Sequence, residues 1–209
     1  MRLAVLASVV IVVAGFAYLL SLLLNIPAGF PMPPTTATRV MASLSVFGSA
    51  PALAAFAYAM RVVCPTRATN IAFAISLTFA MVALANRLTQ LVAVQTLPEH
   101  GLPQWDLYVP NSFAQGAEML AWGWLFGAVT FLLARAVRVT AGAWPARLIG
   151  ATGLMALAAA LVYVVTMIAT LPDWVGGIAV AVGGLAWGIV WPASAGLFIS
   201  AVRSRRAFA

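Results

Sequence analysis

The sequence contains six apolar stretches that are each long enough to cross a lipid bilayer, and this pattern constrains the fold more than any other feature. A membrane-spanning helix needs about 20 consecutive, mostly apolar residues. The stretches cover residues 3–24, 40–60, 71–95, 112–134, 148–170 and 175–202, with short connections between them. We therefore predict an all-α fold, in which residues 1–209 form one domain that is a bundle of six transmembrane helices.

The composition leads to the same fold class. Charged residues make up 7% of the chain and hydrophobic residues 64%, and the mean hydropathy is +1.06. A soluble domain usually carries about 25% charged residues, because its surface must face water. This chain has too few polar side chains to cover such a surface, which indicates an integral membrane protein.

The first apolar stretch resembles a signal peptide in one respect, because Arg2 precedes it. Its apolar run of about 22 residues is longer than the apolar core of a typical signal peptide, and no small-residue cleavage motif follows. We expect a retained helix.

The arginines predict the orientation of the bundle. If the N-terminus is cytoplasmic, the cytoplasmic side holds nine arginines and no acidic residue, whereas the other side holds Arg39 with Glu99, Asp106 and Asp173. An excess of positive charge marks cytoplasmic loops, so both termini are predicted to be cytoplasmic. The nine residues are Arg2, Arg61, Arg67, Arg135, Arg138, Arg147, Arg203, Arg205 and Arg206.

The cellular location is inferred from the same residues. Every basic residue is an arginine, which is a compositional hint of a GC-rich prokaryote. The layout resembles that of small six-helix inner-membrane proteins of bacteria. We expect a prokaryotic inner membrane, with membrane lipids as partners and no nucleic acid, because the arginines lie at the ends of apolar stretches.

Several classes of chemistry are excluded by residue counts and missing motifs. Cys64 is the single cysteine and His100 the single histidine, so an internal disulfide, a cysteine-rich metal site and a histidine-pair centre are ruled out. The sequence has no phosphate-binding loop, no dinucleotide fingerprint and no serine-hydrolase elbow. We therefore predict no metal and no cofactor.

Two charged residues lie inside the apolar stretches and form the candidate site. Arg87 lies about 12 Å below the outer end of the third helix, and Glu118 about 9 Å below the outer end of the fourth. A charge in the bilayer is costly and needs a partner. Since adjacent helices with a short connection pack antiparallel, we predict a buried Arg87–Glu118 ion pair.

Other polar residues accompany this pair. Asn86 and Gln90 share a helical face, as do Gln115, Glu118 and Trp122, because residues three or four apart are neighbours on a helix. We expect the two polar faces to meet in a pocket open to the outer side. The predicted ligand-binding residues are Asn86, Arg87, Gln90, Gln115, Glu118 and Trp122.

Two interpretations of the polar residues remain open. In one, the ion pair holds the third and fourth helices together, as polar groups between membrane helices do. In the other, the pocket binds a small amphipathic molecule, such as a lipid or an isoprenoid. The site has more amide and indole groups than one ion pair needs to satisfy its hydrogen bonds. This excess supports the second interpretation.

An enzymatic role is a weaker alternative. Glu118, with help from Asp173, has the acid groups that a membrane-embedded cyclase or isomerase needs. However, Glu118 would stay ionised beside Arg87. Asp173 follows Pro172 at the start of a helix, where the helix dipole favours an anion. We therefore lean towards a protein that is not an enzyme.

The last helix carries small residues on one face and two tryptophans beside it. Gly184 and Gly188 form a G-x-x-x-G motif, which lets helices approach closely. We expect internal packing, with a homo-oligomer as the alternative. Trp187 and Trp191 are expected to face the interior, because a deep indole needs a partner for its N–H. Pro192, and Pro51 in the second helix, predict kinks.

The expected function follows from the position of the polar groups. They crowd the outer half of the bundle, whereas a transporter with alternating access needs them on both sides of the midplane. We therefore expect an inner-membrane protein that binds or transports a small amphipathic molecule around Arg87 and Glu118. The alternatives are a non-catalytic subunit of a larger membrane complex and, less favoured, the cyclase or isomerase.

Overall fold

The computed structural model describes residues 1–25, 36–92, 112–169 and 173–207, and these residues are almost entirely helical, without a strand. Six helices are long and apolar enough to cross a membrane. The prediction of an all-α chain with six helices of membrane-spanning length is therefore confirmed for the described part of the chain.

Four of these six helices are uninterrupted α-helices, and the other two each contain a π-helical segment. The fourth long helix is continuous through α4, η4 and α5, and the sixth through α7, η5 and α8. The elements are α1 (Arg2–Asn25), α2 (Thr36–Val63), α3 (Arg67–Val92), α4 (Phe113–Glu118), η4 (Met119–Leu125), α5 (Phe126–Ala141), α6 (Ala143–Ala169), α7 (Asp173–Leu185), η5 (Ala186–Val190) and α8 (Trp191–Ala207).

Several helices begin before the predicted apolar stretches. The second, third and fifth were predicted to start at residues 40, 71 and 148, and the structure starts them at Thr36, Arg67 and Ala143. The predicted ends at residues 95 and 170 lie outside the described residues. The extra turns contain polar or charged residues, because helical hydrogen bonding continues after the apolar composition that marked the stretch has ended.

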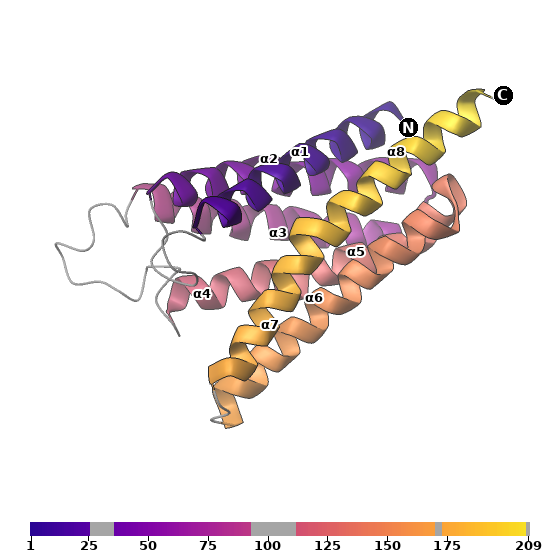
Figure 1. Cartoon of the computed structure of the whole chain (residues 1–209). Helices are drawn as coiled ribbons and strands as arrows, with labels where there is room; N and C mark the ends of the chain where they lie inside the picture. The colour runs from indigo at the N-terminus through magenta and orange to yellow at the C-terminus, as the bar shows by residue number, and fades with distance from the viewer. Residues whose placement is uncertain (26–35, 93–111, 170–172, 208–209) are drawn as a thin grey trace.

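The chain closes into a bundle because its last helix returns to its first. Helix α1 packs on α2, α2 on α3, α5 on α6 and α6 on α7, while η5 and α8 contact α1. Both termini lie at one end of the bundle, which we call the terminal end (Figure 1). Helix α3 ends and α4 begins at the other end, which we call the opposite end. The α6–α7 pair diverges from α1 and α2 towards the opposite end (Figure 1).

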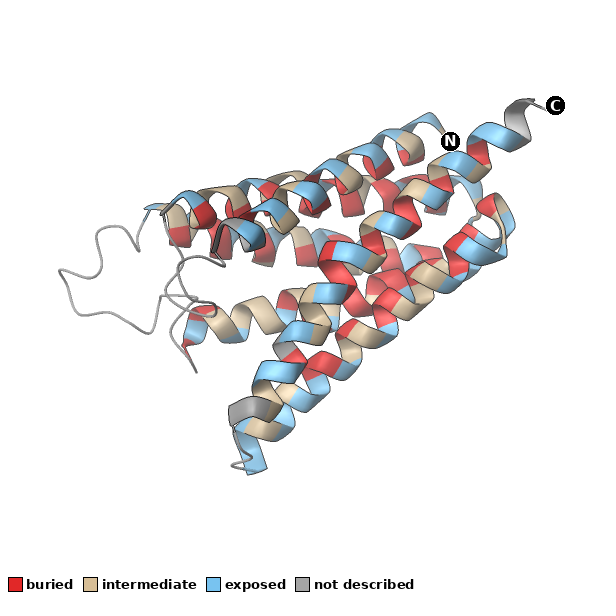
Figure 2. Ribbon diagram, viewed as in Figure 1, coloured by how far each residue is buried: buried red, intermediate tan, exposed pale blue. Residues whose placement is uncertain are grey.

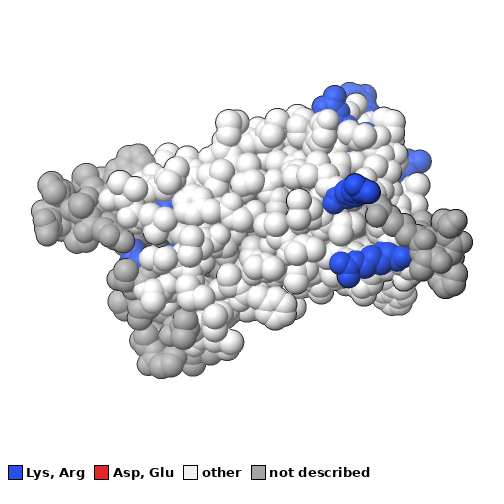
Figure 3. Space-filling model, turned by 90° about the horizontal axis from the view of Figure 1, so that it is seen from above, with Lys and Arg blue, Asp and Glu red and all other residues white. Residues whose placement is uncertain are grey.

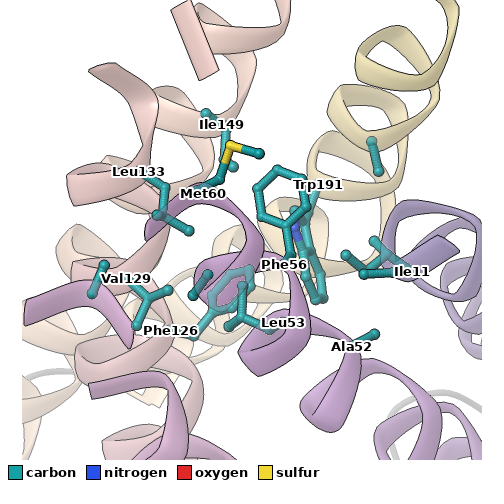
Figure 4. Close-up of a cluster of buried hydrophobic side chains, with 14 of the residues drawn as sticks. Ile11, Ala52, Leu53, Phe56, Met60, Phe126, Val129, Leu133, Ile149 and Trp191 are labelled. Atoms are coloured by element: carbon teal, nitrogen blue, oxygen red, sulfur yellow. The ribbon is translucent and has the colours of Figure 1, made fainter. Parts of the chain in front are cut away.

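The core lies along the middle of the bundle and is built from aromatic and aliphatic side chains. Leu53 and Phe56 of α2 meet Phe126 of α5 and Trp191 of α8 there (Figure 4). The Phe126 and Trp191 ring centroids are 4.9 Å apart. Trp187 and Trp191 are both buried, so the prediction that the two tryptophans face the interior is confirmed.

The outer surface of the bundle is apolar over most of its length. Buried residues line the inner faces of the helices and exposed ones the outer faces (Figure 2). The exposed side chains include large apolar ones such as Val13, Phe16, Met81 and Ile168. A soluble monomer rarely exposes an apolar surface of this extent, whereas a bilayer solvates it.

Glycines allow the closest helix contacts. A Cβ atom on Gly188 would lie 2.9 Å from the Tyr18 ring, and one on Gly15 would lie 2.3 Å from Pro192. The prediction that the glycines of the last helix serve internal packing is confirmed at Gly188. On the other side of the bundle, a Cβ on Gly153 of α6 would lie 2.7 Å from backbone atoms of α5.

This close approach of α5 and α6 leads to a test of the packing. Gly153→Ala places a methyl group against the Gly127 carbonyl oxygen and the Phe131 nitrogen. Overpacking of this kind typically costs about 1–3 kcal/mol, so we expect an earlier thermal unfolding transition in detergent micelles, followed by circular dichroism. The control is Gly196→Ala, where nothing lies within 4 Å of the added Cβ. Equal transitions for both variants would contradict the close contact.

Candidate functional site

Arg87 and Glu118 form the predicted ion pair between α3 and α4. The Nη2 group of Arg87 donates to Oε1 of Glu118. The side chains are 7% and 14% exposed, respectively. Arg87 lies five residues before the described end of α3, and Glu118 is the last residue of α4. The pair therefore lies in the half of the bundle nearer the opposite end, at the shared depth that the sequence predicted.

Asn86 gives the carboxylate a second donor. Its Nδ2 group lies 2.8 Å from Oε2 of Glu118 and 3.1 Å from the carbonyl oxygen of Ala114. Each carboxylate oxygen thus accepts a hydrogen bond from α3, and the asparagine also binds the backbone of α4. The charge of Glu118 is balanced by Arg87, so the described side chains of the cluster carry no net charge.

Gln115 connects the cluster to a third helix. The Tyr163 hydroxyl of α6 donates to Oε1 of Gln115, with 3.1 Å between the two oxygens. Gln90 is buried on the same face of α3 as Asn86. Sequence reasoning placed Gln115 beside Glu118 and did not identify Tyr163. The only available signal was an isolated phenol within an apolar helix.

Trp122 lies four residues after Glu118 and joins the polar cluster to the aromatic core. Its ring centroid is 4.8 Å from that of Phe79 and 4.6 Å from that of Trp187. Its Nε1 atom is buried and has no hydrogen-bond partner among the described residues. A buried donor without an acceptor is unfavourable by about 1–3 kcal/mol, so this indole has an unused binding capacity.

The two contacting tryptophans belong to the two π-helical segments. Trp122 lies in η4 and Trp187 in η5. π-Helical turns are rare and occur frequently at functional sites. The segment η5 ends two residues before Pro192, which has no N–H to donate to the carbonyl of Gly188. The segment η4 contains no proline, and nothing in the sequence indicated it.

The side chains of the other acidic residues that the sequence singled out lie outside the described residues, and a small cavity lies apart from this cluster. Residue 173 begins α7, but the side chain of Asp173 is outside the described residues, as are Glu99, His100 and Asp106. A cavity of about 10 Å³ lies nearer the terminal end, between Ser8, Phe56, Trp191 and Ser194 among others. It has room for about one water molecule. Within the described ranges, no three His, Cys, Asp or Glu side chains gather as a metal site.

Comparison with known proteins adds no functional information. The chain matches no protein-family model, no curated protein and no solved structure.

The ion pair makes a direct prediction about stability. Glu118→Gln removes the counter-charge that the structure describes for Arg87, and breaking a buried ion pair in this way typically costs about 3–5 kcal/mol. Arg87→Met with Glu118→Gln removes both charges and should restore most of that loss, because a buried ion pair adds little net stability over apolar packing. Thermal unfolding in detergent measures both variants. A single variant as stable as the wild type would show that the charge is not buried.

Proposed function

We propose that the chain is a multi-pass membrane protein that binds a small amphipathic molecule at the cluster around Arg87 and Glu118. The unpaired indole N–H of Trp122 is the observation that carries this proposal. A ligand with a hydrogen-bond acceptor would satisfy this donor. The same ligand would place its apolar part against the aromatic rings that surround Trp122.

The charges of the cluster favour a ligand with an uncharged polar group. Arg87 and Glu118 neutralise each other, and Asn86 occupies the second carboxylate oxygen. Glu118 already supplies a negative charge that balances Arg87, so an anionic ligand would add a second negative charge inside the bilayer, which is costly. A carbonyl, ether or hydroxyl oxygen avoids that cost, as in a neutral lipid or an isoprenoid derivative.

The aromatic rings below the cluster provide a surface for the apolar part of the ligand. Trp187 contacts Trp122 on one side and Tyr18 on the other, with ring centroids 4.6 and 3.9 Å apart. These rings come from α1, η4 and η5, so the surface spans the two parts of the bundle that diverge towards the opposite end. Flat rings stack well on unsaturated or ring-containing molecules.

Binding explains the described interior better than transport or catalysis. The buried hydroxyls nearer the terminal end, such as those of Ser8, Thr130 and Ser194, bond to carbonyls of their own helices. They provide no continuous polar path beyond the cluster. Both oxygens of Glu118 are engaged, which suits an anchoring carboxylate better than a catalytic acid.

The proposed orientation places both termini in the cytoplasm of a prokaryotic cell, within its inner membrane. The support is the position of the arginines, most of which lie at the terminal end (Figure 3). Positive charge is retained on the cytoplasmic side. The described arginines at that end are Arg2, Arg61, Arg67, Arg135, Arg138, Arg147 and Arg203. In this orientation, the cluster around Arg87 lies in the outer half of the bilayer.

The ligand proposal is tested by native mass spectrometry of protein extracted gently with its lipids. We expect the wild type to retain a small molecule. Trp122→Phe keeps the ring contacts but removes the N–H, so retention should weaken about two- to tenfold, the usual worth of one hydrogen bond. The matched control is Trp124→Phe, which makes the same change at an exposed position on η4.

Two outcomes would contradict the proposal. One is a wild type without any small molecule that instead co-purifies with other protein chains, which would favour a subunit of a larger complex. The other is equal retention by both tryptophan variants and by the double variant Arg87→Met, Glu118→Gln. That result would place the bound molecule elsewhere on the protein.

The orientation is tested with the single native cysteine. Cys64 lies between α2 and α3 at the terminal end and is partly exposed. A membrane-impermeant maleimide should label it only after permeabilisation of the cells. The control combines Cys64→Ser with Ala37→Cys, an exposed position at the opposite end, which should be labelled in intact cells. The reversed pattern would place the termini outside.

A further inference from the structure

Three exposed arginines surround the turn between α5 and α6 at the terminal end. Arg135 and Arg138 lie in the last two turns of α5, and Arg147 lies in the second turn of α6. Gly142 forms the turn between them with a φ of 103°, and its N–H donates to the carbonyl of Arg138. This one-residue turn brings the three guanidinium groups to the same end of one helical hairpin.

The positive charge at this turn has no described counter-charge within the chain. Glu118 is the only acidic side chain that the structure describes, and it is bound to Arg87 far from the turn. Helix α6 has no acidic residue in its first turn, although the positive end of the helix dipole lies there. The negative end of the α5 dipole lies at the same turn and offsets that of α6. The three guanidinium charges remain, and no described carboxylate of the chain balances them.

Apolar side chains flank the three arginines on the outer surface. Phe131 and Val139, four residues before and after Arg135 on α5, are both exposed. Trp144 is 67% exposed, and the Arg147 guanidinium lies over its ring at 5.3 Å from the centroid. A tryptophan at a helix end is typical of the membrane interface. The arginines thus emerge from an apolar outer surface, beside a tryptophan of the kind that lies at headgroup depth in membrane proteins.

We propose that the α5–α6 hairpin binds the headgroup of an anionic phospholipid, with its phosphate held by Arg135, Arg138 and Arg147. Guanidinium groups bind phosphate through paired, charge-assisted hydrogen bonds. The acyl chains would lie along the exposed apolar side chains of the same hairpin, such as Phe131 and Leu154. This continuity of charged and apolar surface favours a lipid over a soluble phosphate. The site is separate from the cluster around Arg87.

This proposal differs from the general role of arginines in membrane orientation. Orientation depends on how many positive charges lie on one side, whereas a headgroup site depends on where they lie. A matched control can separate the two roles, because Arg2, Arg61 and Arg67 lie at the same end on other helices. Removing either set of three arginines changes the net charge equally.

The experiment titrates purified, delipidated protein with phosphatidylglycerol or phosphatidylcholine and counts bound lipids by native mass spectrometry. We compare the wild type with the hairpin variant Arg135→Gln, Arg138→Gln, Arg147→Gln and the control variant Arg2→Gln, Arg61→Gln, Arg67→Gln. The wild type should prefer phosphatidylglycerol. The hairpin variant should bind it on the order of 100-fold more weakly, from the usual contribution of each arginine near a membrane surface. The control variant should bind it like the wild type.

Several results would overturn the proposal. Equal losses in the two variants would show diffuse electrostatic attraction, and no loss in the hairpin variant would show that lipid binds elsewhere. Equal binding of the two lipids would remove the need for an anion. Displacement of the lipid by inorganic phosphate would show that phosphate alone is the ligand. If the hairpin variant does not fold by circular dichroism, Arg138→Gln and Arg147→Gln are tested singly, each with an expected loss of about fivefold.

Discussion

The buried contact between Arg87 and Glu118 is the interaction on which the arrangement of the fourth long helix depends. A guanidinium group buried among apolar helices is unfavourable unless a counter-charge meets it, so α4 must place Glu118 at the depth of Arg87. Asn86 holds the second oxygen of the same carboxylate and the backbone of α4. Since α4, η4 and α5 are continuous, the register set at Glu118 also determines where Trp122 and Phe126 meet the core.

The π-helical segments connect this polar cluster to the closure of the bundle. Trp122 of η4 contacts Trp187 of η5, which in turn contacts Tyr18 of α1. A π turn adds a residue to the turn and changes the direction of the side chains that follow it. The indole N–H of Trp122 in η4 is buried and has no described hydrogen-bond partner.

Sequence reasoning predicted some features of the fold and the site and missed others. Hydropathy identified six helices, and the helical rise placed Arg87 and Glu118 at one depth, because both arguments need only positions along a single helix. Gln115 was expected to share a helical face with Glu118 and to meet the polar face of the third helix, and the structure shows its oxygen bonded to Tyr163 of α6. That contact depends on how α6 packs against the fourth long helix. The spacing of residues along one helix does not reveal such packing. Asp173 and the loop residues Glu99, His100 and Asp106 were considered from sequence, and their side chains lie outside the described residues.

The sequence by itself determined the helical class, the number of membrane-length helices, the apolar exterior and the end at which most arginines gather. These properties follow from composition along the chain and from the need to satisfy every backbone group within an apolar solvent. Only the tertiary structure decided that α8 closes on α1, that Gly153 lies against the backbone of α5, and that the two π turns meet through their tryptophans. The physical reason is that these contacts depend on the fit between surfaces far apart in the chain, where one methyl group decides how closely two helices approach.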